Sequence, residues 1–150
     1  MRTTAVISQP ISRLSPELQE KPATPLRTYL VEDSATIREN LIATLQELVE
    51  IIPVGWAENS HDAIRWLMQP QARWNLAIVD LFLQQGSGLD VLSACRSRTP
   101  DRKMVVLSNY ATVEMRDRCL ELGADAVFDK STEIDTLIDY CQTLRESPSS

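Results

Sequence analysis

Asp80 is the residue whose position in this sequence points most directly to chemistry. It follows the apolar run Leu76-Ala77-Ile78-Val79, which predicts a strand buried on both faces, as in the middle of a parallel sheet. Open α/β sheets bind their ligands at the carboxyl ends of the strands, so a carboxylate here is placed to act on a ligand. Strand-ending aspartates are also common turn formers and helix caps, and Asp80 alone does not decide between the two interpretations.

Other reactive side chains also stand at the ends of apolar runs. They are Glu32 and Asp33 after residues 26–31, Ser108 at the end of residues 104–108, and Lys130 two residues past residues 126–128. Parallel strands in one sheet would bring all of these side chains to the same rim as Asp80. Each could singly be a solvated loop residue or a helix cap, but chance would then have to place all five at strand ends.

These residue types together suit phosphoryl transfer. Three neighbouring carboxylates repel one another, so they either take up protons or share a cation, and oxygen ligands with open positions suit Mg²⁺. Lys130 adds a compact positive charge and Ser108 a hydroxyl that can donate to a phosphoryl oxygen. Catalysis of phosphoryl transfer consists mostly of such positioning and charge stabilisation.

The elements that must position these side chains alternate strictly between strand and helix. The predicted strands are 26–31, 51–57, 76–80, 104–108 and 126–128, and the predicted helices are 35–48, 60–68, 88–98, 112–122 and 131–144. Such alternation predicts a doubly wound α/β fold, with a five-stranded parallel sheet covered by helices on both faces. Pro53 lacks an N–H and favours an edge position for the second strand, which selects the flavodoxin-like order 2-1-3-4-5.

Local signals place the ends and faces of the helices. Ser34 and Ser60 are predicted N-caps, and Gly123 is predicted to end a helix in the C′ position. The buried stripe of the first helix is predicted from Ile37, Leu41, Leu45 and Leu48, and that of the second from Ala63, Ile64 and Leu67. Glu133 and Asp135 are expected in the first turn of the last helix, where their charge suits the helix dipole.

The length of 150 residues suits one domain. Residues 1–25 contain four prolines and no periodicity, so we expect a flexible extension with at most a short helix near residues 15–20. The domain itself is expected over residues 26–146, followed by a tail at residues 147–150. The room after Lys130 is filled by the last helix, which leads us to expect a single-domain protein.

Composition limits the kinds of partner and environment to be expected for this protein. A net charge of −6 disfavours a nucleic-acid surface. Cys95, Cys119 and Cys141 have neither zinc nor disulfide spacing, so we expect buried, reduced thiols in a cytoplasmic protein. The sequence holds no 18-residue apolar stretch and no signal-peptide pattern at its start, so no membrane association is expected.

Over about residues 26–145 the chain resembles the receiver domain of two-component response regulators, of the stand-alone type related to chemotaxis regulators. The matching segments are Val31-Glu32-Asp33-Ser34, Val79-Asp80 with Gly88 eight residues on, Val106-Leu107-Ser108, and Gly123-Ala124-Asp125 leading to Lys130. The resemblance implies a phosphoacceptor signalling domain that catalyses only its own phosphorylation and dephosphorylation. It also implies a partner histidine kinase or phosphotransfer protein and a downstream protein target.

The resemblance assigns roles to individual residues. Asp80 would accept the phosphoryl group from a phosphohistidine. Asp33, Asp80 and the backbone carbonyl of Phe82 would bind Mg²⁺ directly, and Glu32 through water. Ser108 would be the hydroxyl that moves onto the phosphoryl group, and Lys130 the lysine that pairs with it.

Four positions would modulate this chemistry. Asn109 replaces the small residue usual beside the switch hydroxyl and could crowd the entry. Val127 stands where the family often has an aromatic residue, and alternation along the strand directs Phe128 to the other face. Phe82 and Tyr110 each lie two residues past a site residue, where their rings would either shield the phosphoryl group from water or merely pack on the surface.

Rival interpretations remain open. The nearest is a degenerate receiver that works as a phosphorylation-independent interaction scaffold. A flavodoxin-like cofactor binder shares the topology, but Glu32 and Asp33 would repel its phosphate. A phosphatase of the dehalogenase type would need a second acid two residues after the nucleophile, where this chain has Phe82.

Overall fold

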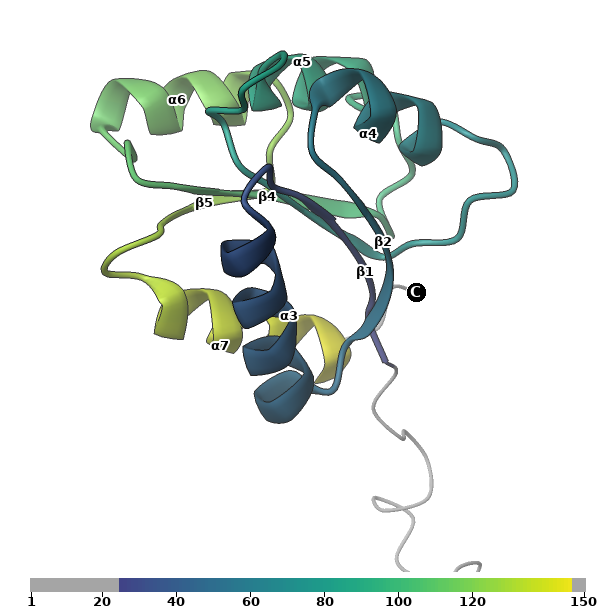
Figure 1. Cartoon of the computed structure of the whole chain (residues 1–150), viewed down its shortest axis with the longest axis vertical. Coiled ribbons are helices and arrows are strands. Elements are labelled where there is room, and N and C mark those ends of the chain that lie inside the picture. Colours follow the sequence, from purple (N-terminus) through teal and green to yellow (C-terminus); the bar gives the residue numbers. More distant parts are fainter. Residues whose placement is uncertain (1–24, 147–150) are drawn as a thin grey trace, which may run out of the picture.

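The computed structural model describes residues 25–146, which form a five-stranded parallel sheet between two layers of helices (Figure 1). The strand order is β2-β1-β3-β4-β5, so the predicted doubly wound fold is confirmed. The strands are β1 (Arg27–Val31), β2 (Ile52–Ala57), β3 (Leu76–Val79), β4 (Lys103–Ser108) and β5 (Ala126–Asp129). The helices are α3 (Ala35–Val49), α4 (Ser60–Leu67), α5 (Gly88–Ala94), α6 (Val113–Glu121) and α7 (Ile134–Glu146).

The expected short helix near residues 15–20 and the tail at residues 147–150 lie outside the described residues, as does the flexible extension expected over residues 1–25, apart from Pro25. None of the helices that the structure describes is both long and apolar enough to cross a membrane.

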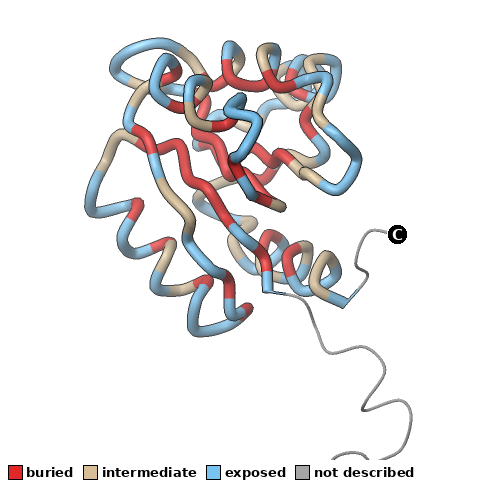
Figure 2. The backbone as a smooth tube through the Cα atoms, turned by 90° about the vertical axis from the view of Figure 1, so that its right-hand side faces the viewer, coloured by how far each residue is buried: buried red, intermediate tan, exposed pale blue. Residues whose placement is uncertain are grey.

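Each face of the sheet is covered by its own helices and its own apolar core. Helices α4, α5 and α6 lie on one face, and α3 and α7 on the other (Figure 1). All four residues of β3 are buried, and Figure 2 shows buried backbone running through the middle of the molecule. Strand residues alternate between the two cores: Ala77 and Val79 pack with α4–α6, whereas Leu76 and Ile78 pack with α3 and α7. The three cysteines are buried and free, as expected.

Pro53 lies on the edge strand, as its missing N–H predicts. The pairing of β1 with β2 shifts by one residue there: Pro53 lies opposite Thr28, but Gly55 lies opposite Tyr29. The irregularity leaves Val54 outside the regular ladder. With β2 at the edge, β1 takes the second position in the sheet.

Two of the three predicted caps are confirmed. The Ser34 hydroxyl accepts a hydrogen bond from the N–H of Ile37, and Gly123 follows the end of α6 with a φ of +107°, a conformation that favours glycine. The prediction for Ser60 was wrong, because Asn59 caps α4 by accepting a 2.8 Å hydrogen bond from the N–H of Asp62. Ser60 is instead the first, buried residue of the helix.

The buried face of α3 is rotated from the predicted one. Ile37 and Leu48 are 38% and 52% exposed, whereas Arg38 and Val49 are buried beside Leu41 and Leu45. A stripe with 3.6-residue period runs through positions 38, 41, 45 and 49 equally well, and the packing of a buried arginine decided the choice. In α4 the predicted face is confirmed for Ala63 and Leu67, with Ile64 partly buried.

Two helices differ from their predicted bounds by more than two residues at one end. Helix α5 ends at Ala94 with Cys95 as its C-cap, instead of continuing to residue 98. Helix α7 begins at Ile134, because Asp129 accepts hydrogen bonds from the N–H groups of Ser131 and Thr132 and holds that segment in a turn. Glu133 therefore lies before the helix and not in its first turn.

Candidate functional site

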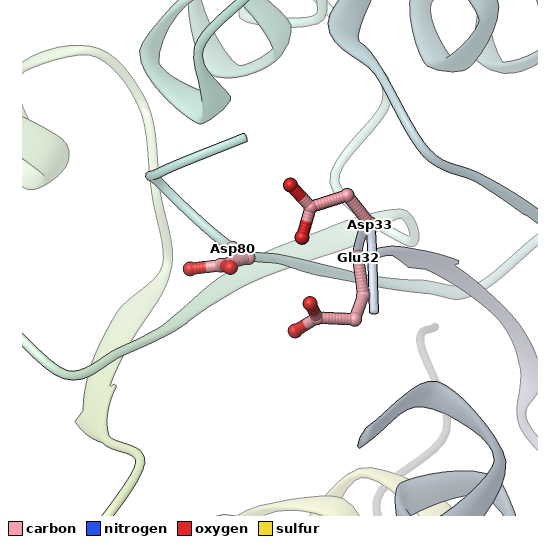
Figure 3. Close-up of side chains that lie close together, drawn as sticks. All are labelled: Glu32, Asp33 and Asp80. Atoms are coloured by element: carbon pink, nitrogen blue, oxygen red, sulfur yellow. The ribbon is translucent and has the colours of Figure 1, made fainter. Parts of the chain in front are cut away.

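The carboxylates of Glu32, Asp33 and Asp80 lie close together at the carboxyl end of the sheet (Figure 3). One oxygen from each lies within 4.8 Å of the others. The cause is topological: β1 and β3 are neighbours in the sheet, with Val31 opposite Val79, so the residues that follow each strand emerge side by side. Glu32 and Asp80 are buried and Asp33 is half-buried.

Lys130, the residue directly after β5, completes the cluster. Its Nζ donates to Glu32 Oε1 at 2.8 Å and lies 3.4 Å from Asp80 Oδ2. Burial alone would lower the pKa of Lys130, but the hydrogen bond to Glu32 and the charge of Asp80 outweigh that effect and raise it. Lys130 therefore stays positively charged beside the carboxylates.

Burial raises the pKa of Asp80 above its usual range, although the charge of Lys130 opposes the shift. The charge of Glu32 raises the pKa further, and the N–H of Phe82, 3.4 Å from Asp80 Oδ1, lowers it slightly. Folding thus disfavours the ionised form of Asp80. Additional positive charge in the cluster would stabilise that form.

The loop after β1 is held by a buried arginine that the sequence analysis did not single out. Arg38 Nη1 donates to the backbone oxygen of Glu32 at 2.8 Å, and its guanidinium lies 3.8 Å from the ring centroid of Trp56. The backbone N–H of Glu32 donates to Ala57 on β2, and the N–H of Ser34 donates to Glu32 Oε2. The peptide and the carboxylate of Glu32 are thereby both fixed.

The β3–α5 loop closes the other side of the site. The N–H of Gln84 donates to Asp33 Oδ2 at 2.8 Å, which joins this loop to the one after β1. Gly88 packs so closely on the backbone carbonyl of Asp80 that a Cβ there would overlap it. This close approach gives a physical reason for the glycine eight residues after Asp80.

Ser108 lies at the end of β4 and is fully buried. Its Oγ accepts a 3.0 Å hydrogen bond from the N–H of Tyr110. The next residue, Asn109, is exposed, and its Oδ1 accepts a 3.3 Å hydrogen bond from the hydroxyl of Ser131. Ser108 thus belongs to the same end of the sheet, with its oxygen engaged by its own loop.

Phe82 and Tyr110 contact each other across the two loops. Their ring centroids are 5.0 Å apart at an interplanar angle of 65°, an edge-to-face arrangement. Both residues are more than half exposed, so the pair forms a partial cover on loops that follow Asp80 and Ser108. The two aromatic positions singled out in the sequence are therefore one structural unit.

The side chains of Val127 and Phe128 face opposite sides of the sheet, as alternation predicts. Val127 packs with the core under α4–α6, and Phe128 packs with that of α3 and α7, where it meets Tyr140 edge-to-face. Arg116 of α6 donates to the backbone oxygen of Val127 at 2.9 Å and to Glu133 at 2.8 Å. This link between α6, β5 and the turn before α7 was not predicted, since nothing in the local pattern pairs residues 116 and 133.

A divalent hard cation fits the cluster. Its three donors are carboxylate oxygens from Glu32, Asp33 and Asp80, the ligand type that Mg²⁺ and Ca²⁺ bind. Burial, and to a smaller extent the charge of Glu32, raises the pKa of Asp80, and the positive charge of such an ion would oppose both effects.

Comparison with known proteins identifies the family. Residues 29–142 match the response regulator receiver domain. A probable transcriptional regulatory protein of Picosynechococcus sp. is 29% identical over 136 residues, which cover 87% of this chain and 53% of that protein. The photosynthetic apparatus regulatory protein RegA of Cereibacter sphaeroides is 37% identical over 104 residues, 69% of this chain and 54% of its own length.

The fold has close structural neighbours among receiver domains. The response regulator domain of Thermotoga maritima CheB superposes with a TM-score of 0.71 at 15% identity, over 84% of this chain and all of that one. The chain spans about half the length of the two curated relatives. Because one of these is named as a transcriptional regulator, the expectation of a single-domain protein without nucleic-acid contact has no support from them. This chain belongs to the response regulator receiver domain family.

Proposed function

We propose that Asp80 accepts a phosphoryl group from the phosphohistidine of a partner kinase or phosphotransfer protein, in a reaction that requires Mg²⁺. The observation that carries the proposal is the convergence of the Glu32, Asp33 and Asp80 carboxylates with the Lys130 ammonium. The family match over residues 29–142 supports the same assignment.

The transfer is a substitution at phosphorus. An oxygen of the Asp80 carboxylate forms the new bond, and the bond from phosphorus to the donor imidazole nitrogen breaks, its electron pair leaving with the imidazole. Asp80 must be ionised to attack, and Lys130 at 3.4 Å favours that form against the effect of burial. The buried position of Asp80 limits competing water around the nucleophile.

Mg²⁺ bound by Asp33, Asp80 and the backbone carbonyl of Phe82, with Glu32 acting through water, would neutralise the charge on the phosphoryl oxygens. The N–H of Gln84 orients the Asp33 carboxylate, and Arg38 and Ser34 orient Glu32. These contacts hold the acidic groups in place before a cation or phosphate arrives, which lowers the cost of assembling the site.

Lys130 and Ser108 would respond to the new group. Phosphorylation adds a doubly charged group beside Lys130, whose ammonium can transfer part of its bonding from Glu32 to the phosphoryl oxygens. The Ser108 hydroxyl would donate to a phosphoryl oxygen after giving up its bond to the N–H of Tyr110. That exchange would move the β4–α6 loop. Through the bonds of Arg116 to Val127 and Glu133 it would affect α6, β5 and the start of α7, which together form the surface that we propose for binding a downstream target.

Incubation of the full chain with acetyl phosphate and Mg²⁺, followed by intact-mass measurement, tests the proposal. We expect one phosphoryl group on the wild type and none on Asp80→Asn or on wild type treated with EDTA. Asp117→Asn serves as the matched control, because it removes an exposed carboxylate of α6 that makes no side-chain bond among the described residues. Labelling of Asp80→Asn would contradict the assignment of the acceptor.

The scaffold interpretation makes the opposite prediction for the same experiment. A degenerate receiver would stay unmodified under conditions in which Mg²⁺ binds, and its partner affinity would not respond to a phosphodonor. The presence of all three carboxylates together with Lys130 favours a receiver that is phosphorylated over a scaffold that is not.

A further inference from the structure

Positive charge gathers at the amino-terminal end of the sheet, opposite the carboxylate cluster. Six of the chain's fifteen Lys and Arg residues line two adjoining cavities there. They are Arg27, Arg73, Arg96, Arg98, Arg102 and Lys103. The whole chain carries a net charge of −6, so this end differs in sign from the rest of the molecule.

The larger cavity has a volume of about 390 Å³ and lies where β1, β3 and β4 begin. Arg27, Arg73 and Arg102 line it with Asn75, and Asp101 is the one acidic residue in the described lining. The second cavity, of about 280 Å³, shares Arg102 and adds Arg96, Arg98 and Lys103. Its one acidic residue in the described lining is Asp125, which pairs with Arg98. The two cavities together form one basic concave surface.

Asn75 and Arg102 build a fixed frame for this surface. Asn75 Oδ1 accepts from the backbone N–H of Arg27 at 3.0 Å, and its backbone oxygen accepts from the N–H of Lys103 at 2.8 Å. Arg102 Nη2 donates to the backbone oxygen of Ala72 at 2.6 Å, with its guanidinium 5.2 Å from the Trp74 ring centroid. The backbone that carries the basic side chains is thus held in place without a ligand.

The six cations divide into two that the fold engages and four that it does not. Arg102 donates to Ala72. Arg98 donates to the backbone oxygens of Arg102 and Gly123 and pairs with Asp125 at 2.6 Å. Within the part of the chain that the structure describes, no side-chain hydrogen bond or ion pair engages the other four, Arg27, Arg73, Arg96 and Lys103. These four are available to an anion.

We propose that this surface binds a ligand that carries two or more linked phosphate groups. Guanidinium forks pair with phosphate oxygens in a bidentate way, and a volume of about 390 Å³ lies in the range of small-molecule sites. A protein partner is disfavoured, because protein interfaces centre on exposed aromatic or apolar anchors and the aromatic residue here, Trp74, is 3% exposed. An inorganic oligophosphate and a nucleoside polyphosphate share this chemistry.

The proposal is independent of phosphorylation at Asp80. None of the lining residues belongs to the carboxylate cluster, and the two sites lie at opposite ends of the strands. The protein can therefore be tested without Mg²⁺, which would otherwise bind to the oligophosphate itself.

Titration of the ¹⁵N-labelled full chain, followed by amide NMR shifts, tests the proposal with three probes: tripolyphosphate, ATP and adenosine. We expect both phosphate compounds to shift the amides of Arg27, Asn75 and Lys103, with affinity that falls as salt is added. Equal affinities would assign the site to the phosphate chain, and tighter binding of ATP would show that the nucleoside adds contacts. Shifts of these amides by adenosine as large as those by ATP would overturn the proposal.

Two double variants distinguish binding at this surface from general electrostatic attraction to the protein. Arg27→Gln with Arg73→Gln should weaken tripolyphosphate binding at least tenfold. Arg65→Gln with Arg118→Gln removes the same charge from exposed positions on α4 and α6 and should change binding less than twofold. Melting temperatures equal to the wild type's would show that both pairs are folded. An equal loss in the two pairs, or full binding in the first, would overturn the proposal.

Discussion

Lys130 donates a 2.8 Å hydrogen bond to Glu32, a residue 98 positions earlier in the chain. The same ammonium lies 3.4 Å from Asp80, so one cation separates two buried carboxylates that would otherwise repel each other. The pair also ties the loop after β5 to the loop after β1, at opposite sides of the sheet's centre. We therefore expect stability and the proposed chemistry to depend on the same contact.

Removal of the Lys130 charge should destabilise the fold. In Lys130→Gln, Glu32 and Asp80 lose their shared cation while remaining largely buried, and we expect a loss of about 2 kcal/mol in the free energy of unfolding. Urea denaturation measures it. Glu32→Gln combined with Lys130→Gln should recover part of the loss, because the unpaired charge is gone. An unchanged midpoint for the single variant would contradict this account.

Neutralising Asp80 should stabilise the metal-free protein at neutral pH. A carboxyl group whose pKa is raised by folding binds its proton more tightly in the folded state, so its ionisation lowers stability as the pH rises through the folded pKa. We expect Asp80→Asn to melt at a higher temperature than the wild type in EDTA, with the difference shrinking toward acidic pH. Melting curves across that pH range measure the difference. A difference that grows on acidification would contradict the prediction.

Arg38 should control the geometry of the acidic cluster. Arg38→Gln removes the donor to the Glu32 carbonyl and the contact with Trp56, for an expected loss of about 2 kcal/mol in stability and about tenfold weaker Mg²⁺ binding by calorimetry. Glu58→Gln is the matched control. Its ion pair with Arg38 is 3.7 Å long and half-exposed, so it should cost no more than about 0.5 kcal/mol. Equal effects of the two variants would argue against a role through Glu32.

The aromatic pair should set the lifetime of phospho-Asp80. The Phe82 and Tyr110 rings contact each other at 5.0 Å and offer no carboxylate or amide to orient an attacking water. Phe82→Asn with Tyr110→Glu should speed loss of the label about tenfold, which corresponds to about 1.4 kcal/mol of barrier. Val113→Asn, at an exposed position near the start of α6, should leave the rate unchanged. Equal decay of the double variant and the wild type would leave the pair without a role in timing.

Phosphorylation should loosen or rearrange residues 108–140. The Ser108 hydroxyl must leave the N–H of Tyr110 to reach a phosphoryl oxygen, and Arg116 connects that loop to β5 and Glu133. Amide hydrogen exchange with and without beryllofluoride and Mg²⁺ should differ most in this range. Changes confined to α3 would contradict this prediction.

The sequence by itself determined the order of the elements and the reactive residues that follow the strands. Apolar runs, the Pro53 break and the Ser34 cap are local signals, because each depends on the backbone of a few neighbouring residues. Strand order then placed Glu32, Asp33, Asp80 and Lys130 at one edge, since parallel neighbours expose their carboxyl ends together. The candidate site was therefore predictable as a set of residues.

The tertiary structure alone decided how those residues meet. The burial of Arg38 against Trp56, the edge-to-face contact of Phe82 with Tyr110 and the bond from Arg116 to Glu133 each join distant segments. Periodicity marks which side of a helix is apolar but permits a rotation of the stripe, so Ile37 was expected inside and Arg38 is found there. Long side chains choose partners only after the sheet has brought their loops together, and that choice depends on packing and charge in three dimensions.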